Sequence, residues 1–203
     1  MQDTQLIALD IDGTLIAPGA GHQAVPDAEI ADAIARLVEA GVHVVLASGR
    51  MYPGTARIAR HLRLDGPLIC QQGASIHRMD GSLLHRFAID ADIANQLVAF
   101  AQEHDWPFAW FDAVRYLVSR PNDASAEYGR VSGVTLEARY GDRINLLDFP
   151  SVTAAHAREA SKGNALALLA QDLGIEQHAV LAIGDSVNDA SMLRWAGRCR
   201  NAA

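Results

Sequence analysis

The segment LIALDIDGTL, residues 6–15, places two aspartates at the end of an apolar run. An apolar run of this length that leads into Asp-Gly is typical of a buried strand ending in a tight turn. Residues i and i+2 of an extended chain point to the same side and lie about 6.6 Å apart. We therefore predict that Asp10 and Asp12 face one cavity at the end of a buried strand.

Apolar runs and amphipathic segments alternate near both ends of the chain. Apolar runs of strand length occupy residues 5–10, 42–47, 67–71 and 179–183. Helical periodicity covers residues 26–40 and 53–63, and a third helix is predicted to begin at Ser161, a favoured N-cap residue. Strands that alternate with helices are typical of a parallel sheet with helices on both faces. The sequence thus predicts a three-layer, Rossmann-like α/β fold.

The pattern changes in the middle of the chain. Residues 90–104 have helical character, and residues 106–119, WPFAWFDAVRYLVS, predict two strands joined at Asp112-Ala113. This is α+β material, and we expect its aromatic side chains to form a small core. The chain is therefore predicted to consist of a core, residues 1–80 and 159–203, and an inserted α+β domain, residues 81–158.

Charge and cysteine content exclude several classes of function. The formal net charge of −7 disfavours nucleic acid as a partner, because phosphate backbones are bound by clustered Lys and Arg. The two cysteines lack CxxC spacing, which argues against zinc and a disulfide framework. The apolar runs are too short to span a membrane, and no signal peptide is evident. We expect a cytoplasmic protein without membrane partners, and eight histidines with surface or structural roles.

Polar residues follow the predicted strands where each strand ends. Asp10–Thr14, Ser48–Arg50 and Gly184–Asp189 stand at three strand ends, and Lys162 stands at a helix start. In parallel α/β sheets, ligands bind outside the carboxyl ends of the strands, near the point where the strand order reverses. We therefore expect these segments to converge on one crevice.

The acids of these segments suit a hard cation. Asp10, Asp12, Asp185 and Asp189 would repel one another and stay partly protonated unless a cation lay among them. Oxygen ligands of this kind suit Mg2+, with substrate phosphate completing the coordination shell. Lys162 and Ser48 could then hold phosphate oxygens. A nucleophile, an acid/base, a metal and a cationic side chain are the requirements of phosphoryl transfer.

Four segments, in order, resemble the four motifs of haloacid dehalogenase-like hydrolases. They are Asp10-x-Asp12-Gly13-Thr14, Ser48-Gly49-Arg50, Lys162-Gly163-Asn164 and Gly184-Asp185-x-x-Asn188-Asp189. The form of the second motif, and an insertion between the second and third, are similar to the Cof-type sugar-phosphatase branch. The resemblance covers roughly residues 1–80 and 159–197. One such motif is weak evidence, but four in order are strong evidence.

The resemblance implies a role for each matched position. Asp10 would attack phosphorus and become an aspartyl phosphate, and Asp12 would protonate the leaving alcohol and then activate water. Mg2+ would be bound by Asp10, the backbone carbonyl of Asp12 and Asp185, with Asp189 supporting that shell. Phosphate would be held by Ser48, Gly49, Lys162 and Asn188. The expected substrate is a small phosphorylated metabolite, such as a sugar phosphate.

The sequence departs from the family pattern in three places. Gln72-Gly73 stands where relatives usually have Asn-Gly, and the insertion is shorter than the usual cap of this branch. Few residues follow Asp189, where relatives continue with a strand and a helix. The sheet edge there could be uncovered, it could be filled by a second copy in a homo-oligomer, or the chain could be truncated.

Two alternatives to a phosphatase stay open at this point. A phosphotransferase or phosphomutase would use the same four motifs and pass the phosphoryl group to a sugar hydroxyl instead of water. A catalytically degraded relative would bind phosphorylated ligands without turning them over, although every catalytic position of the family is filled here.

Overall fold

The central element of the computed structural model is a parallel sheet of four strands in the order β10-β9-β1-β2. The structure describes residues 4–21, 23–112, 115–120, 122–123, 126, 136–137 and 156–202. The four strands are β1 (Leu6–Leu9), β2 (His43–Leu46), β9 (Val180–Gly184) and β10 (Arg198–Asn201). Leu6 of β1 lies opposite His43 on one side and Val180 on the other. The strand order therefore reverses at β1.

The alternation of side chains along the strands builds two apolar cores, one on each face of the sheet. Leu6 and Ala8 face one core, whereas Ile7 and Leu9 face the other. In β2, Val45 faces the first core and its neighbours face the second. Side chains alternate because successive residues of a strand point to opposite faces. Burial on both faces explains why these strands are continuous apolar runs in the sequence.

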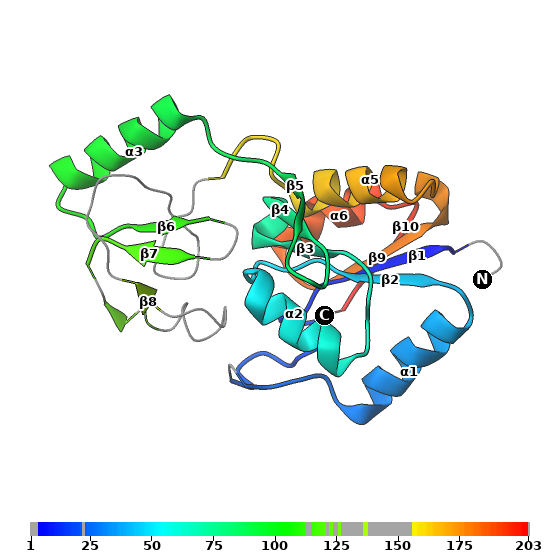
Figure 1. The fold of residues 1–203 in the computed structure, drawn as a ribbon. Coiled ribbons are helices and arrows are strands. Elements are labelled where there is room, and N and C mark those ends of the chain that lie inside the picture. The colour runs from blue at the N-terminus through cyan, green and yellow to red at the C-terminus, as the bar shows by residue number, and fades with distance from the viewer. Residues whose placement is uncertain are drawn as a thin grey trace.

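Helices cover both faces of this sheet (Figure 1). The helices α1 (Ala28–Glu39) and α2 (Tyr52–His61) lie on one face, and α5 (Lys162–Asp172) and α6 (Ala190–Trp195) lie on the other. The first helix begins after Asp27, whose side chain accepts a hydrogen bond from the backbone N–H of Ile30. The predicted three-layer α/β fold is confirmed, although α1 begins two residues after the predicted start at Pro26.

A small antiparallel sheet extends the core beyond β2. A parallel bridge between Ala47 and Ile69 places β3 (Leu68–Cys70) beside the end of β2. Strand β4 (Ser75–His77) pairs with β3 and with β5 (Leu83–Arg86). A short 3₁₀ turn, η1 (Gln71–Gly73), connects β3 to β4. Strand β5, which lies beyond the predicted boundary at residue 81, thus pairs with a strand that precedes it.

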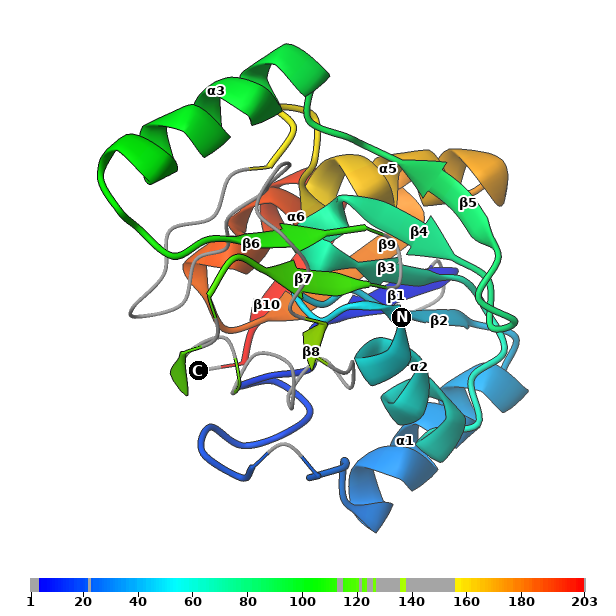
Figure 2. The ribbon, with the colours of Figure 1, turned by 60° about the vertical axis from the view of Figure 1, so that its left-hand side comes forward.

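The middle of the chain forms a second unit beside the core (Figures 1 and 2). It contains α3 (Ala91–Glu103) and a three-stranded sheet of β6 (Ala109–Phe111), β7 (Tyr116–Val118) and β8 (Leu136–Glu137). Val98, Ala101 and Phe108 form its small core, with Trp110 packed against them. The helix at 90–104 and the two strands within 106–119 were predicted from the sequence, and the structure contains them. Much of residues 120–158 lies outside the described part of the chain.

The segment after Asp189 adds one more strand to the sheet. Helix α6 follows a 3₁₀ turn, η3 (Val187–Asp189), and β10 pairs in parallel with β9. The sheet edge beside β9, which the sequence left open, is therefore covered by β10. Within the described ranges, no helix combines the length and the apolar character needed to cross a membrane.

The apolar contacts of α5 can be tested at Leu166, which is fully buried between the sheet and α6. Replacing Leu166 with Ala removes buried methyl groups and leaves a cavity, which costs roughly 2–5 kcal/mol of unfolding free energy. Gln171 lies on the same helix and is exposed, so Gln171→Ala is expected to stay within about 0.5 kcal/mol of wild type. Urea unfolding of the three proteins measures both effects. Equal stability of all three would contradict the packing.

Candidate active site

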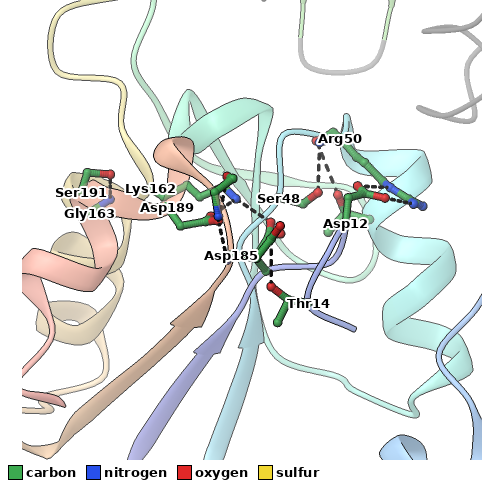
Figure 3. Close-up of polar contacts among 12 residues, drawn as sticks. Asp12, Thr14, Ser48, Arg50, Lys162, Gly163, Asp185, Asp189 and Ser191 are labelled. Carbon is green, nitrogen blue, oxygen red and sulfur yellow. Dashed lines mark hydrogen bonds and ion pairs between the residues drawn. The ribbon is translucent and has the colours of Figure 1, made fainter. Parts of the chain in front are cut away.

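The predicted motifs meet at the carboxyl ends of β1, β2 and β9 (Figure 3). The strand order reverses at β1, so these three strand ends lie at the reversal point. We call this end of the sheet the catalytic edge. In parallel α/β sheets, ligands bind in the crevice outside the carboxyl ends of the strands. The predicted convergence of the strand ends is therefore present in the structure.

Lys162 stands at the centre of the site. Its Nζ lies 2.5 Å from Oδ1 of Asp10 and 2.6 Å from Oδ1 of Asp189. The side chains of Lys162 and Asp189 are 2% and 0% exposed, so these are buried ion pairs. Lys162 is the first residue of α5, where the helix dipole disfavours a positive charge. The two carboxylates therefore offset both the burial and the dipole.

The second carboxylate oxygen of Asp189 organises the loop after β9. Its Oδ2 accepts hydrogen bonds from the backbone N–H of Asp185 at 3.2 Å and of Ser186 at 3.0 Å. The hydroxyl of Ser186 donates to the same oxygen at 2.9 Å. Ser186 and Asp189 form a capping box around η3. Asp189 thus fixes the loop that presents Asp185.

Asp185 lies against the turn that follows β1. The hydroxyl of Thr14 donates to Oδ1 of Asp185 at 3.2 Å. Gly13 has a φ of +91°, and a Cβ added there would lie 2.1 Å from Oδ2 of Asp185. Only glycine fits this close approach without displacing the carboxylate. Gly13 and Thr14, which follow β1, therefore pack directly against the carboxylate of Asp185.

Three acids of the site could hold a cation. One carboxylate oxygen from each of Asp10, Asp185 and Asp189 lies within 4.8 Å of the other two. Three carboxylates with oxygen ligands only match the preference of Mg2+. Asp12, which the sequence analysis added through its backbone carbonyl, is not among these three side chains. Its part in metal binding stays a prediction.

Burial dominates the electrostatics of Asp10. The pKa of Asp10 is raised from 3.8 to about 6, chiefly by burial, and the charge of Asp189 raises it further. The ammonium group of Lys162 lowers this pKa and is the largest opposing influence. Without a further cation, the ionised form of Asp10 is therefore less favoured at this position than it is in water.

Asp12 binds Arg50 on the other side of the site (Figure 3). Arg50 donates from Nε to Oδ2 of Asp12 at 2.9 Å and from Nη2 to Oδ1 at 2.5 Å. The guanidinium is buried, whereas the Asp12 side chain is 53% exposed. Strand β1 ends at Leu9 and the chain bends at Ile11, so the extended geometry that was expected to place both aspartates on one side does not continue through Asp12. The two aspartates have different partners.

The residues predicted to hold phosphate lie in different surroundings. Ser48 is fully buried and its Oγ accepts a hydrogen bond from the backbone N–H of Arg50. Gly49 packs so closely on Gln72 that an added Cβ would lie 2.5 Å from Nε2 of that amide. Asn188 is exposed on η3. No ligand tests these assignments, so the phosphate set stays a prediction.

Sequence reasoning missed three polar partners of the site. Arg50 was quoted within the second motif but given no role, and Thr14 and Ser186 were not assigned to the site. A signal existed for Ser186, because Ser followed three residues later by an acid is a capping-box pattern. No local pattern predicts that Arg50 pairs with Asp12, since the two residues belong to different strand ends.

Comparisons with known proteins agree with this geometry. The sequence profile of a family described as haloacid dehalogenase-like hydrolase matches residues 7–148 and 135–200. YxeH of Bacillus subtilis (strain 168) is 30% identical, over 95% of this chain and 85% of its own length. The HMP-PP phosphatase of Citrobacter koseri is 27% identical, over 96% of this chain and 82% of its own length.

Solved structures share the fold at lower identity. A haloacid dehalogenase-like hydrolase from Bacteroides thetaiotaomicron superposes with a TM-score of 0.81 at 20% identity, over 96% of this chain and 86% of its own. The subclass IIB sugar phosphatase BT4131 superposes with a TM-score of 0.80 at 18% identity, over 97% of this chain and 86% of its own. The family profile covers nearly the whole chain and includes all four motifs. The chain belongs to the haloacid dehalogenase-like hydrolases.

Proposed function

We propose that this protein is a Mg2+-dependent phosphatase that hydrolyses a small phosphorylated metabolite through an aspartyl phosphate on Asp10. The observation that carries the proposal is the buried contact of Asp10 with Lys162, beside two further acids at the reversal of strand order. A carboxylate that attacks the phosphorus of an anionic phosphate monoester needs a nearby positive charge to offset the repulsion between the two. Lys162 supplies one such charge within the protein itself.

The acids of the site would hold the metal. Asp10, Asp185 and Asp189 offer converging carboxylate oxygens, and the raised pKa of Asp10 fits a position that a cation would relieve. Bound there, Mg2+ would neutralise charge on the phosphoryl oxygens and keep Asp10 ionised. The hydrogen bonds that Asp189 accepts from residues 185 and 186 keep this part of the site in place.

Asp10 and Asp12 would carry out the chemical steps. In the proposed reaction an oxygen of Asp10 forms a bond to phosphorus as the bond to the leaving alcohol breaks, and Asp12 gives that alcohol its proton. Water then attacks phosphorus, Asp12 takes a proton from it, and phosphate leaves with Asp10 regenerated. Arg50 holds the Asp12 carboxylate through two parallel hydrogen bonds, a geometry that fixes its orientation.

The second unit is proposed to be a cap that selects the substrate. Its helix and sheet have their own small core and stand beside the catalytic edge rather than within the core sheet. The pairing of β5 with β4 favours a domain division near Phe87 rather than at residue 81. The named relatives include phosphatases for HMP-PP and for 5-amino-6-(5-phospho-D-ribitylamino)uracil, the latter 27% identical. These names support a small phosphorylated metabolite as the substrate class.

The activity is tested by replacing Asp10 with Asn. The amide keeps the size of the side chain but is a far weaker nucleophile, so release of inorganic phosphate from 4-nitrophenyl phosphate with Mg2+ should fall at least about a thousandfold. Asp65→Asn is the matched control, because Asp65 is exposed, and it should keep wild-type activity. Undiminished phosphate release by Asp10→Asn would contradict the assignment. Transfer of phosphate to a sugar without its release would instead support the phosphotransferase alternative.

Metal binding is tested by measuring how Mg2+ changes the Tm of thermal unfolding. Mg2+ that binds only the folded protein stabilises it by about 2.7 kcal/mol at 100 times its Kd, which raises Tm by roughly 5–10 °C in a protein of this size. Asp185→Asn removes one proposed ligand and should abolish most of this shift, whereas Asp65→Asn should keep it. A wild-type Tm that is insensitive to Mg2+ would contradict the proposed metal site.

The raised pKa of Asp10 predicts a pH dependence of stability in metal-free protein. Because the pKa is higher in the folded state (about 6) than in the unfolded state (3.8), the folded protein binds more protons between these values. Stability from this group is present below pH 3.8 and is lost as pH rises through 6. Wild type should lose about 2–3 kcal/mol relative to Asp10→Asn between pH 4 and 8. Urea unfolding of both proteins in the presence of a chelator, at pH 4 and at pH 8, measures this loss. An equal difference in unfolding free energy between the two proteins at both pH values would contradict the prediction.

A further inference from the structure

The turn η1, Gln71–Gly73, touches both the catalytic edge and the second unit. Gln71 and Gln72 both have positive φ, 53° and 57°, which is uncommon for residues other than glycine. A Cβ added to Gly73 would lie 2.2 Å from the carbonyl oxygen of Ser161, so the turn presses on the start of α5. Lys162 is the next residue. The turn is therefore held in an unusual backbone conformation directly beside the catalytic lysine.

The Gln71 side chain reaches from this turn to the second unit. Its Nε2 donates a hydrogen bond to the backbone carbonyl oxygen of Asp112 at 2.9 Å. Asp112 follows β6 directly and lies in the connection to β7. Gln71 is 8% exposed, so this contact is largely shielded from water. A buried side chain of the core thus holds the backbone of the β6–β7 hairpin.

A chain of buried hydrogen bonds orients the Gln71 amide. The hydroxyl of Ser75 donates to Oε1 of Gln71 at 2.9 Å, and Nε2 of His77 lies 3.0 Å from the same hydroxyl oxygen. A backbone carbonyl can only accept, so Asp112 requires the amide nitrogen of Gln71. The amide oxygen must then accept the single proton of Ser75, and Ser75 must accept from His77. The other ring nitrogen of His77, Nδ1, lies 3.3 Å from the backbone carbonyl oxygen of Gly81.

We propose that Gln71 is a positioning residue that fixes the β6–β7 hairpin over the active site and so sets the fit of the substrate's leaving group. The inference rests on the proposed phosphatase function and deepens it. The phosphoryl group is handled by core residues, all of which lie outside the hairpin. Gln71 should therefore matter for substrates whose leaving group is large enough to reach the hairpin, and not for a minimal phosphoryl donor.

Two substitutions remove the contact in different ways. Gln71→Glu is isosteric and still accepts from Ser75, but its carboxylate cannot donate to the carbonyl of Asp112. Gln71→Met has a similar length, adds no charge and cannot donate either, so it covers the case in which a buried carboxylate prevents folding. Gln96→Glu is the matched control, because Gln96 is exposed on α3 and the change in charge is the same.

Hydrogen exchange tests the contact without any substrate. In Gln71→Glu and Gln71→Met the amides of β6 and β7 should exchange about fivefold faster than in wild type, the effect of losing one neutral hydrogen bond. Exchange in β1 should stay unchanged, and Gln96→Glu should match wild type throughout. Unchanged exchange in β6 and β7 would overturn the role of Gln71 whatever the phosphatase activity is.

Kinetics test the consequence for the leaving group. For 4-nitrophenyl phosphate, kcat/KM should fall about fivefold in both Gln71 variants, whereas for acetyl phosphate it should equal that of wild type. An equal fall with both substrates, or no fall with either, would overturn the positioning role. Failure of wild type to release phosphate from any donor would refute the proposed function, and the exchange experiment would still decide whether Gln71 holds the hairpin.

Discussion

The buried ammonium group of Lys162 is the interaction on which the rest of the site depends. It joins β1 to the loop after β9 through Asp10 and Asp189, and it does so from the first turn of α5. Burying three charges is costly, and the cost is offset only while Lys162 stays between the two carboxylates. Loss of the ammonium group would leave two buried carboxylates facing each other without a cation. This requirement fixes the relative positions of three segments that are distant in sequence.

Two aspartates at one strand end have acquired different surroundings. Asp10 is buried and faces cationic Lys162, whereas Asp12 is half exposed and held by the two-pronged contact with Arg50. A nucleophile and a proton carrier need such different environments, because one must stay ionised and the other must exchange protons with substrate and water. In the proposed mechanism, the different partners that the fold supplies to Asp10 and Asp12 fit these two roles.

Most elements of the core were predictable because their signals are local. Continuous apolar runs predicted β1, β2 and β9, and Ser161 predicted the start of α5, where its side chain caps Asn164. Short strands with mixed polarity were not predicted, among them β4, β5 and β10, whose four residues are all exposed. Their strand structure comes from pairing with a neighbour, which single-sequence periodicity does not detect. The ordered motifs likewise indicated the family before any geometry was known.

The sequence by itself determined the α/β class and the acids at the strand ends, and it contained the unused capping signal around Asp189, because each depends on residues close together along the chain. The tertiary structure alone decided which acids converge, that Asp12 pairs with Arg50, and that Gln71 reaches the β6–β7 hairpin. These contacts join residues separated by tens of positions or more. Their existence depends on strand order and on side-chain direction at a sheet edge, neither of which a local pattern encodes.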